Sequence, residues 1–201
     1  EIIATADCVW GVLDGINDQG LSVSINYGGC LTEGKGFGIT IVMRYILEVC
    51  STVEEAIAVL NRVPVHLDYN IALLDKAGNH ATVFIAPDRE PNVTQATIST
   101  NHQGPATAEK PLFLEDTLTR LDALQHLLGS TELTLSSAVG AFLQPPLYRQ
   151  HDVYDSGTLY TAVYNPEHCY ARYIWPHTSL PLSFDHFEEQ TITIEYGPQP
   201  V

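Results

Sequence analysis

Two asparagines stand at positions where a side-chain amide could stabilise negative charge. Residues 21–26 alternate apolar and polar side chains, which predicts a strand with two different faces, and Asn26 lies at its end, just before a pair of glycines. Asn101 follows another predicted strand, over residues 94–100. Glycines let backbone approach a ligand closely, and a neutral amide N–H can donate to a developing oxyanion. Both amides are therefore candidates for stabilising a tetrahedral intermediate.

Each asparagine also has a purely structural interpretation. Asn26 can simply terminate its strand, and Asn101 can be a turn residue whose side chain bonds its own backbone. On residue type alone, the structural interpretation of Asn101 is the stronger of the two. Arg120 has a comparable alternative, because it lies four residues after Asp116 in a predicted helix, where such a pair contributes only about 0.2–0.5 kcal/mol.

Strands separated by paired helices must position these residues. The 201 residues fit one domain, and the pattern predicts an α+β fold in which helices cover a mostly antiparallel sheet. Capping residues open two of the helices, namely the capping box Ser51-Thr52-Val53-Glu54 and Thr134. We expect helices at 39–50, 112–128 and 135–143, and one that opens at the capping box and ends near Arg62. We expect strands at 2–6, 20–27, 67–75, 80–86, 94–100, 158–164, 169–175 and 190–196.

Composition excludes several classes of function. The formal net charge of -15, from 9 Lys and Arg against 24 Asp and Glu, argues against nucleic acid and anionic membrane surfaces as partners. No apolar run is long enough to span a membrane, and no signal peptide is visible, so we expect a cytoplasmic protein. The histidines and cysteines show no metal-ligand spacing, and neither a metal nor a cofactor is expected. Cys8 is expected to be a buried structural thiol.

The order and spacing of several segments resemble one protein family. Asp14-Gly15-x-Asn17-x-x-Gly20-Leu21, followed by a strand and Asn26, is similar to the choloylglycine hydrolase and penicillin acyltransferase group of N-terminal-nucleophile hydrolases, and most similar to the acyltransferase branch. The resemblance runs from about residue 8 to about residue 195. Further segments that carry it are Ser51–Ala56, Tyr69–Asp75, Ser99–Gln103 and Gly157–Tyr164.

The resemblance implies an αββα sandwich and an amidohydrolase or acyltransferase that cleaves linear amide C–N bonds through a thioester. In such families the nucleophile is an N-terminal Cys exposed by self-cleavage, whose α-amine, with an ordinary pKa of about 7.7–8.0, acts as the base. The resemblance makes Asn101 the oxyanion donor and Asn26 its support. It places Arg120 near the nucleophile, where a cation would lower the thiol pKa.

The nucleophilic Cys is not in this chain. Residue 1 is Glu, and Glu1–Ala6 reads as the interior of a strand, so we expect a fragment or one chain of a processed protein. The expected partners are a small-molecule amide or acyl-donor substrate and an upstream segment or second chain that carries the nucleophile. Further copies in a homo-oligomer are also expected, because a truncated sheet exposes an unpaired edge. The alternative is a truncated or vestigial binding domain of the same fold without catalysis.

Overall fold

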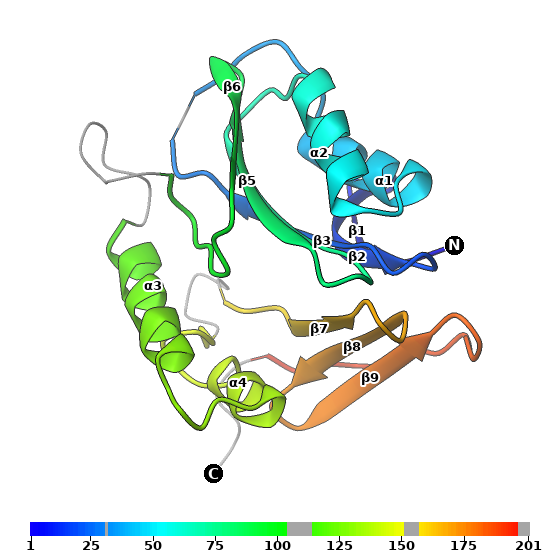
Figure 1. Ribbon diagram of the computed structural model, residues 1–201. Coiled ribbons are helices and arrows are strands. Elements are labelled where there is room, and N and C mark those ends of the chain that lie inside the picture. Colours follow the sequence, from blue (N-terminus) through cyan, green and yellow to red (C-terminus); the bar gives the residue numbers. More distant parts are fainter. Residues whose placement is uncertain (31, 104–113, 151–156, 197–201) are drawn as a thin grey trace.

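Residues 1–30, 32–103, 114–150 and 157–196 are described in the computed structural model. Within them the chain forms two antiparallel sheets and four helices (Figure 1). The larger sheet has the order β1-β2-β3-β4-β5-β6, and the smaller has the order β7-β8-β9. The strands are β1 (Ile2–Asp7), β2 (Gly11–Asn17), β3 (Ser22–Tyr27), β4 (Tyr69–Leu74), β5 (His80–Ala86), β6 (Arg89–Thr94), β7 (Thr161–Asn165), β8 (Tyr170–Trp175) and β9 (Thr178–Ser183).

The helices lie outside the two sheets. In Figure 1, α1 and α2 cover one face of the larger sheet, the smaller sheet lies toward its other face, and α3 stands beside both sheets. Successive side chains of a strand point to opposite faces of its sheet, so alternate residues of each strand face the space between the two sheets. The helices are α1 (Ile39–Val49), α2 (Val53–Arg62), α3 (Leu114–Leu128) and α4 (Leu135–Ala141).

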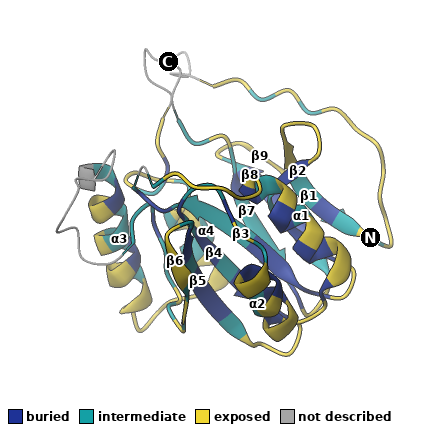
Figure 2. Ribbon diagram, turned by 90° about the horizontal axis from the view of Figure 1, so that it is seen from above, coloured by how far each residue is buried: buried dark blue, intermediate teal, exposed yellow. Residues whose placement is uncertain are grey.

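Two apolar clusters hold the layers together. The larger cluster lies between the larger sheet and the helices α1 and α2, whose buried sides face the sheet in Figure 2. Met43 and Ile46 of α1 are fully buried there against strand residues such as Ile71 and Val83. The smaller cluster joins the two sheets through Ile3, Ile16, Ala171 and Tyr173. The layers are therefore helix, sheet and sheet, with polar side chains left free to line part of the space between the sheets.

Two glycines of β2 allow α1 to lie close to the sheet. A Cβ on Gly11 would lie 2.3 Å from Thr40 Oγ1, and a Cβ on Gly15 would lie 3.0 Å from Leu47 Cδ1 and 2.6 Å from Ala4 Cβ. Glycine is otherwise unfavourable inside a strand. The strand β2 was not predicted from the sequence, because the glycines that let a helix pack on it are residues that are rare inside strands.

Local capping largely follows the sequence, with one shift. Thr52 caps α2, because its side chain accepts from the Glu55 amide while the Glu55 carboxylate accepts from the Thr52 amide. The capping box is thus Thr52 with Glu55, one residue later than predicted. Thr134 caps α4 as predicted, by accepting from the Ser137 amide.

Two predicted strands are wrong. β6 ends at Thr94, and residues 95–100, predicted as a strand, run outside the regular sheet. β6 contains Pro91 and β9, also unexpected from the sequence, contains Pro181; both are edge strands, where a residue without an N–H is tolerated. Residues 190–196 form no strand, and the Tyr196 hydroxyl instead donates to the Leu159 carbonyl.

The other predicted elements are present with bounds close to those expected. The first two residues of the helix predicted at 112–128 lie outside the described residues.

In the described part of the chain, no helix has both the length and the apolar character that crossing a membrane requires.

Candidate active site

Asn26 lies on the face of the larger sheet that is turned away from α1 and α2. Its neighbours Val23 and Ile25 belong to the helix-side core, so alternation places Ser24 and Asn26 on the opposite face. Asn26 is half-buried and is the cross-strand partner of Asn70 on β4. Among the described residues, the Asn26 side chain has no hydrogen-bond partner. Its amide is therefore available to a ligand on that face.

Asn101 does not directly follow a strand, as the sequence predicted, but lies in the irregular segment after β6. This segment is nonetheless anchored, because Thr82 Oγ1 on β5 donates to the Ala96 carbonyl over 2.8 Å. The Asn70 amide binds the carbonyls on both sides of Asn101, donating to Thr100 O at 2.7 Å and to His102 O at 2.9 Å. Asn101 is thus held beside the end of β4, which pairs with β3, the strand that carries Asn26.

Arg120 contacts Asn101 directly. The Arg120 guanidinium on α3 donates through Nη2 to Asn101 Oδ1 at 3.3 Å and through Nε to Asp116 Oδ2 at 3.0 Å. The Arg120 side chain, which is 25% exposed, therefore makes both the ion pair with Asp116 in its own helix and the contact with Asn101. Because the guanidinium occupies the carbonyl side of the Asn101 amide, the two N–H groups point away from the cation. No hydrogen bond from these groups is found within the described ranges.

His102 joins the same segment to α3. Its Nδ1 lies 3.1 Å from Thr100 Oγ1 and 3.2 Å from Thr117 Oγ1, and Thr117 is fully buried. Burial, and secondarily the Arg120 charge, lower the pKa of His102. A neutral imidazole can accept a hydroxyl hydrogen at Nδ1, whereas a protonated ring cannot. The two contacts of His102 Nδ1 therefore join α3, and with it Arg120, to the segment.

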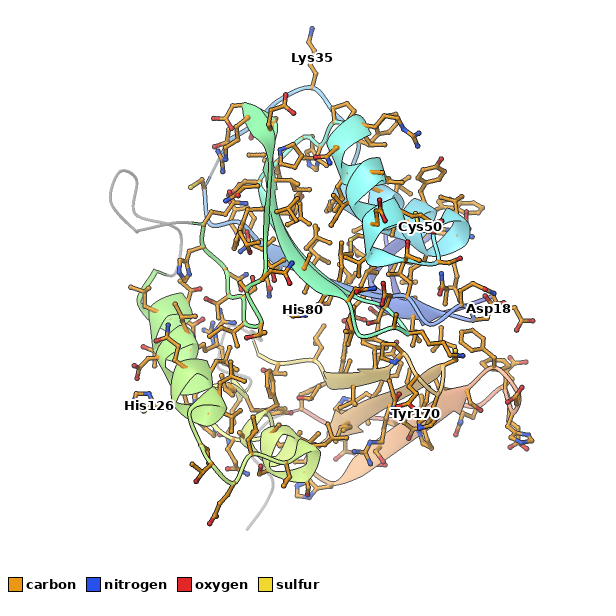
Figure 3. All side chains as sticks on the ribbon, viewed as in Figure 1. Asp18, Lys35, Cys50, His80, His126 and Tyr170 are labelled. Carbon is orange, nitrogen blue, oxygen red and sulfur yellow. The ribbon has the colours of Figure 1, made fainter. Side chains whose placement is uncertain are left out.

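A cavity of about 370 Å³ lies on the inner face of the larger sheet. Its lining includes Ser24, two residues from Asn26 on the same face of β3, and Tyr164 from the smaller sheet. His80, labelled between the sheets in Figure 3, also lines it, and the buried atoms His80 Nε2 and Ser99 Oγ have no hydrogen-bond partner among the residues that the structure describes. The cavity is therefore lined by both apolar and polar groups, and it lies two residues along the chain from Asn26 at Ser24 and from Asn101 at Ser99.

A carboxylate joins the two sheets at the side of this space. Asp14 on β2 accepts hydrogen bonds from Thr5 Oγ1 at 2.6 Å, Tyr164 Oη at 2.7 Å and Tyr160 Oη at 2.9 Å. Burial, together with the Asp14 charge, raises the pKa of both phenols, and burial raises that of Tyr173, which lies 3.1 Å from Tyr164, to about 12. These phenols remain protonated donors at neutral pH, so the network fixes the spacing of the sheets.

Cys8 is exposed, which corrects the expectation of a buried thiol. It lies in the tip between β1 and β2 with φ at 51°, and the neighbouring Asp7 charge raises its thiol pKa. Cys8, Cys30, Cys50 and Cys169 are thiols rather than disulfides, and Cys50 is the buried one, at the helical layer in Figure 3. Cys8 therefore lacks the electropositive surroundings that activate a cysteine nucleophile.

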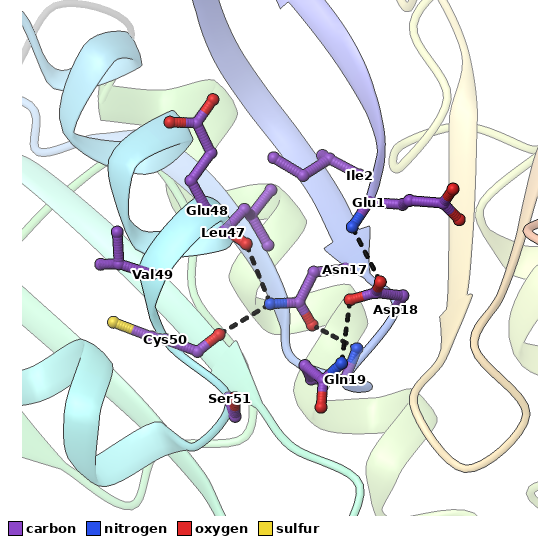
Figure 4. A pocket seen from close by; sticks show the side chains of 10 residues that line it. All are labelled: Glu1, Ile2, Asn17, Asp18, Gln19, Leu47, Glu48, Val49, Cys50 and Ser51. Carbon is purple, nitrogen blue, oxygen red and sulfur yellow. Dashed lines mark hydrogen bonds and ion pairs between the residues drawn. The ribbon is translucent and has the colours of Figure 1, made fainter.

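A second cavity, of about 320 Å³, lies near the chain start and the end of α1 (Figure 4). Its buried Asn17 donates to Leu47 O at 3.0 Å and Cys50 O at 2.7 Å and accepts from the Leu21 amide. These bonds tie the end of β2 to the end of α1, so we assign this cavity a structural role. No cluster of His, Cys, Asp or Glu that could hold a metal ion is found in the part of the chain that is described.

Asn26 lies near the end of β3, and Asn101 and Arg120 lie near the adjacent end of β4, to which Asn70 joins them. The sequence did not single out Asn70, Thr117 or Gln103, whose side chain donates to Tyr69 O and Ile85 O at the same end of β4. One signal was present, since asparagine is depleted in strands and Asn70 stands inside a predicted one. The hydroxyl of Thr117 in a helix carries no such signal.

Solved amide hydrolases share this fold. The Caenorhabditis elegans ortholog of N-acylethanolamine-hydrolyzing acid amidase matches with a TM-score of 0.50 at 17% identity, over 73% of this chain and 74% of that chain. A mutant and a variant of the conjugated bile acid hydrolase from Clostridium perfringens match with TM-scores of 0.61 and 0.59. Their identities are 12% and 13%, over 97% and 96% of this chain and 83% of each of theirs. The fold is that of the N-terminal-nucleophile hydrolases, as predicted.

Sequence comparison gives the family. No curated protein sequence matches this chain. A family model described as acyl-coenzyme A:6-aminopenicillanic acid acyl-transferase matches residues 1–180, which include Asn26, Asn101 and Arg120. The chain belongs to the acyl-coenzyme A:6-aminopenicillanic acid acyl-transferase family.

Proposed function

We propose that this chain is the oxyanion-stabilising part of a self-processing cysteine amidohydrolase or acyltransferase that acts on linear amide C–N bonds. The observation that carries the proposal is the contact between Arg120 and Asn101. It turns the N–H side of a half-buried amide away from the cation, and Ser99, two residues before Asn101, lines the cavity between the sheets. A preorganised neutral donor of this kind is what a developing oxyanion requires.

Arg120 supports the donor electronically as well as sterically. A cation hydrogen-bonded to an amide oxygen polarises the amide, and polarised chains of hydrogen bonds strengthen one another. The N–H groups of Asn101 are therefore better donors than those of an isolated asparagine. Asn26, whose amide is on the inner face two residues from the cavity-lining Ser24, supplies a second donor to the same intermediate.

The nucleophile in this proposal is an N-terminal Cys of an upstream segment or a second chain. Its α-amine takes the thiol proton, and the sulfur attacks the amide carbon. Asn101 and Asn26 stabilise the resulting oxyanion. The proton then passes to the leaving nitrogen, the C–N bond breaks and a thioester forms. Water or an amine attacks the thioester and releases the acyl product, which regenerates the thiol.

The test begins with the protein expressed from its complete gene. Intact mass and N-terminal sequencing should reveal a polypeptide that begins with Cys, and the protein should hydrolyse members of a panel of N-acyl amides. Blocking that Cys with iodoacetamide should abolish turnover. A native product that begins at Glu1, has no partner chain and turns over no amide would overturn the catalytic proposal. It would leave the binding domain as the function.

A further inference from the structure

We infer that Asn70 is a positioning residue that fixes Asn101 relative to Asn26 by binding the two carbonyls on either side of Asn101. The inference rests on the proposed function, because the geometry that Asn70 fixes is that of the proposed oxyanion donors. Asn70 touches neither the substrate nor the reacting atoms in this arrangement; it acts through Asn101.

The first argument is the shape of the contact. One nitrogen, Asn70 Nδ2, donates both of its hydrogens, to Thr100 O at 2.7 Å and to His102 O at 2.9 Å. The two carbonyls belong to the residues before and after Asn101. Both neighbours are acceptors, so only the nitrogen of the Asn70 amide can face them. The backbone that carries Asn101 is thereby held at two points by a single planar group.

The second argument is the register of the sheet. Asn70 and Asn26 are cross-strand partners in the antiparallel pair of β4 and β3, so their side chains stand on the same face. Cβ atoms of such partners lie about 4.5–5.5 Å apart. Asn70 is therefore next to Asn26 across the strands and is bonded to the backbone on both sides of Asn101. A shift of Asn70 would change the distance between the two oxyanion donors.

The third argument is the cost of placing an amide there. Asn70 is fully buried, and its Oδ1 has no hydrogen-bond partner among the described residues. Burying an unsatisfied polar atom is unfavourable. A residue that only filled space would be apolar. The cost is offset by the two donated bonds, whose single result is the placement of the turn that carries Asn101.

Gln103 shows that the segment is held from a second side. Its Nε2 donates to Tyr69 O at 3.0 Å and to Ile85 O at 3.1 Å, which lie on the paired strands β4 and β5. Asn70 and Gln103 thus bind the segment to the sheet on both sides of Asn101. The Asn101 side chain is left to contact Arg120.

The chain offers a matched control in Asn17. Asn17 is 2% exposed, and its Nδ2 also donates to two backbone carbonyls, those of Leu47 and Cys50 (Figure 4). It lies at the other end of the sheet from Asn26. Asn17→Asp and Asn70→Asp remove the same two donors and introduce the same buried carboxyl, so both should lower the free energy of unfolding. Only Asn70→Asp should change catalysis.

The expected result in the complete protein is a loss in kcat of about 100-fold for Asn70→Asp, because a displacement of about 1 Å can cost that much, with KM changed less than about threefold. Asn17→Asp should keep kcat within about twofold at temperatures where it is folded. As the pH falls, the ratio of the Asn70→Asp rate to the wild-type rate should rise, since a protonated carboxyl regains one donor. Asn70→Ser, which keeps one hydroxyl donor, should lose less kcat than Asn70→Asp.

Hydrogen exchange separates this inference from the proposed function. In Asn70→Asp or Asn70→Ser, the backbone amide of His102, which donates to Thr100 O over 2.8 Å, should lose protection while those of α1 do not, and Asn17→Asp should show the reverse. If the wild type is active but Asn70→Asp and Asn70→Ser keep full kcat, the inference is wrong and the function stands. If the wild type is inactive, the function fails, and unchanged protection of the His102 amide would overturn the inference as well.

Discussion

The guanidinium of Arg120 binds the amide oxygen of Asn101 over 3.3 Å and so joins α3 to the segment that follows β6. The two residues are 19 positions apart in the sequence. Their contact determines which side of the Asn101 amide faces the cation and which side is left to donate. It is the link between the electrostatics of the site and its geometry.

Replacing Asn101 by Asp should abolish most activity without unfolding the protein. Aspartate keeps the oxygen that accepts from Arg120 but removes both N–H donors and adds a negative charge beside the developing oxyanion. The expected loss in kcat is about 100- to 1,000-fold, the range seen when one oxyanion donor is removed. Steady-state kinetics on an N-acyl amide measure it. Asn92→Asp, at an exposed position of β6, is the control and should have no effect; an active Asn101→Asp enzyme would contradict the role of Asn101.

Replacing Arg120 by Met should move the acidic limb of the pH–rate profile to higher pH. A nearby cation lowers the pKa of a thiol and of an α-amine, so its removal raises both. Arg120→Lys keeps the charge and should shift the profile less. The matched control is Arg44→Met, which breaks an exposed i,i+4 pair with Glu48 on α1. An unchanged profile in Arg120→Met would show that the guanidinium does not act on the nucleophile.

The stability of the fold should fall below about pH 6.5, the ordinary pKa of His102. Burial lowers the pKa of His102 in the folded state, so in this range the unfolded chain binds more protons and protonation favours unfolding. The contribution is fully present above the unfolded pKa and is lost as the pH falls through the folded one. Glutamine at position 102 does not titrate. The free energies of unfolding in urea of the wild type and of His102→Gln should therefore diverge as the pH falls from about 7 to about 5, a range that includes the ordinary histidine pKa of about 6.5. Parallel curves would contradict the buried, neutral state of His102.

Gly15→Ala and Gly140→Ala should change stability in opposite directions. The new methyl at residue 15 would lie 2.6 Å from Ala4 Cβ and 2.8 Å from Ile3 O, so β1 must shift, at about 1–3 kcal/mol. At residue 140, in α4, nothing lies within 4 Å of the new methyl, and alanine should stabilise the helix by about 0.5–1 kcal/mol. Thermal and urea unfolding of the two variants measure the difference; equal effects would show that β1 and β2 are not in close contact at Gly15.

Most elements were predictable because their residues follow one rule each. The alternation in β3 and the capping residues before α2 and α4 act locally, so the sequence displays them. The failures lie where a distant element overrides local preference. Gly11 and Gly15 are unfavourable inside a strand, yet they form part of β2, where neighbouring elements leave no space for a Cβ. Pro91 and Pro181 argue against strands, yet β6 and β9 are edges, where the missing N–H costs little.

The candidate site shows the same division. Asn26, Asn101 and Arg120 were identified through a resemblance that spans nearly the whole chain, and the structure places Arg120 against Asn101. The partners that hold them were not predictable, because the bonds from Asn70 to Thr100 and His102 cross about 30 residues and depend on the register of β4 with β3. Spacing along the chain does not encode which carbonyls a buried amide will meet.

The prolines in the outer strands have a consequence for assembly. Each sheet has two edges, and in both sheets one of them, β6 or β9, contains a proline that interrupts the backbone donors. The other edges, β1 and β7, contain none. A strand added at β6 or β9 would meet a residue that has no N–H to donate, whereas one added at β1 or β7 would not. The prolines thus disfavour edge-to-edge association at one edge of each sheet.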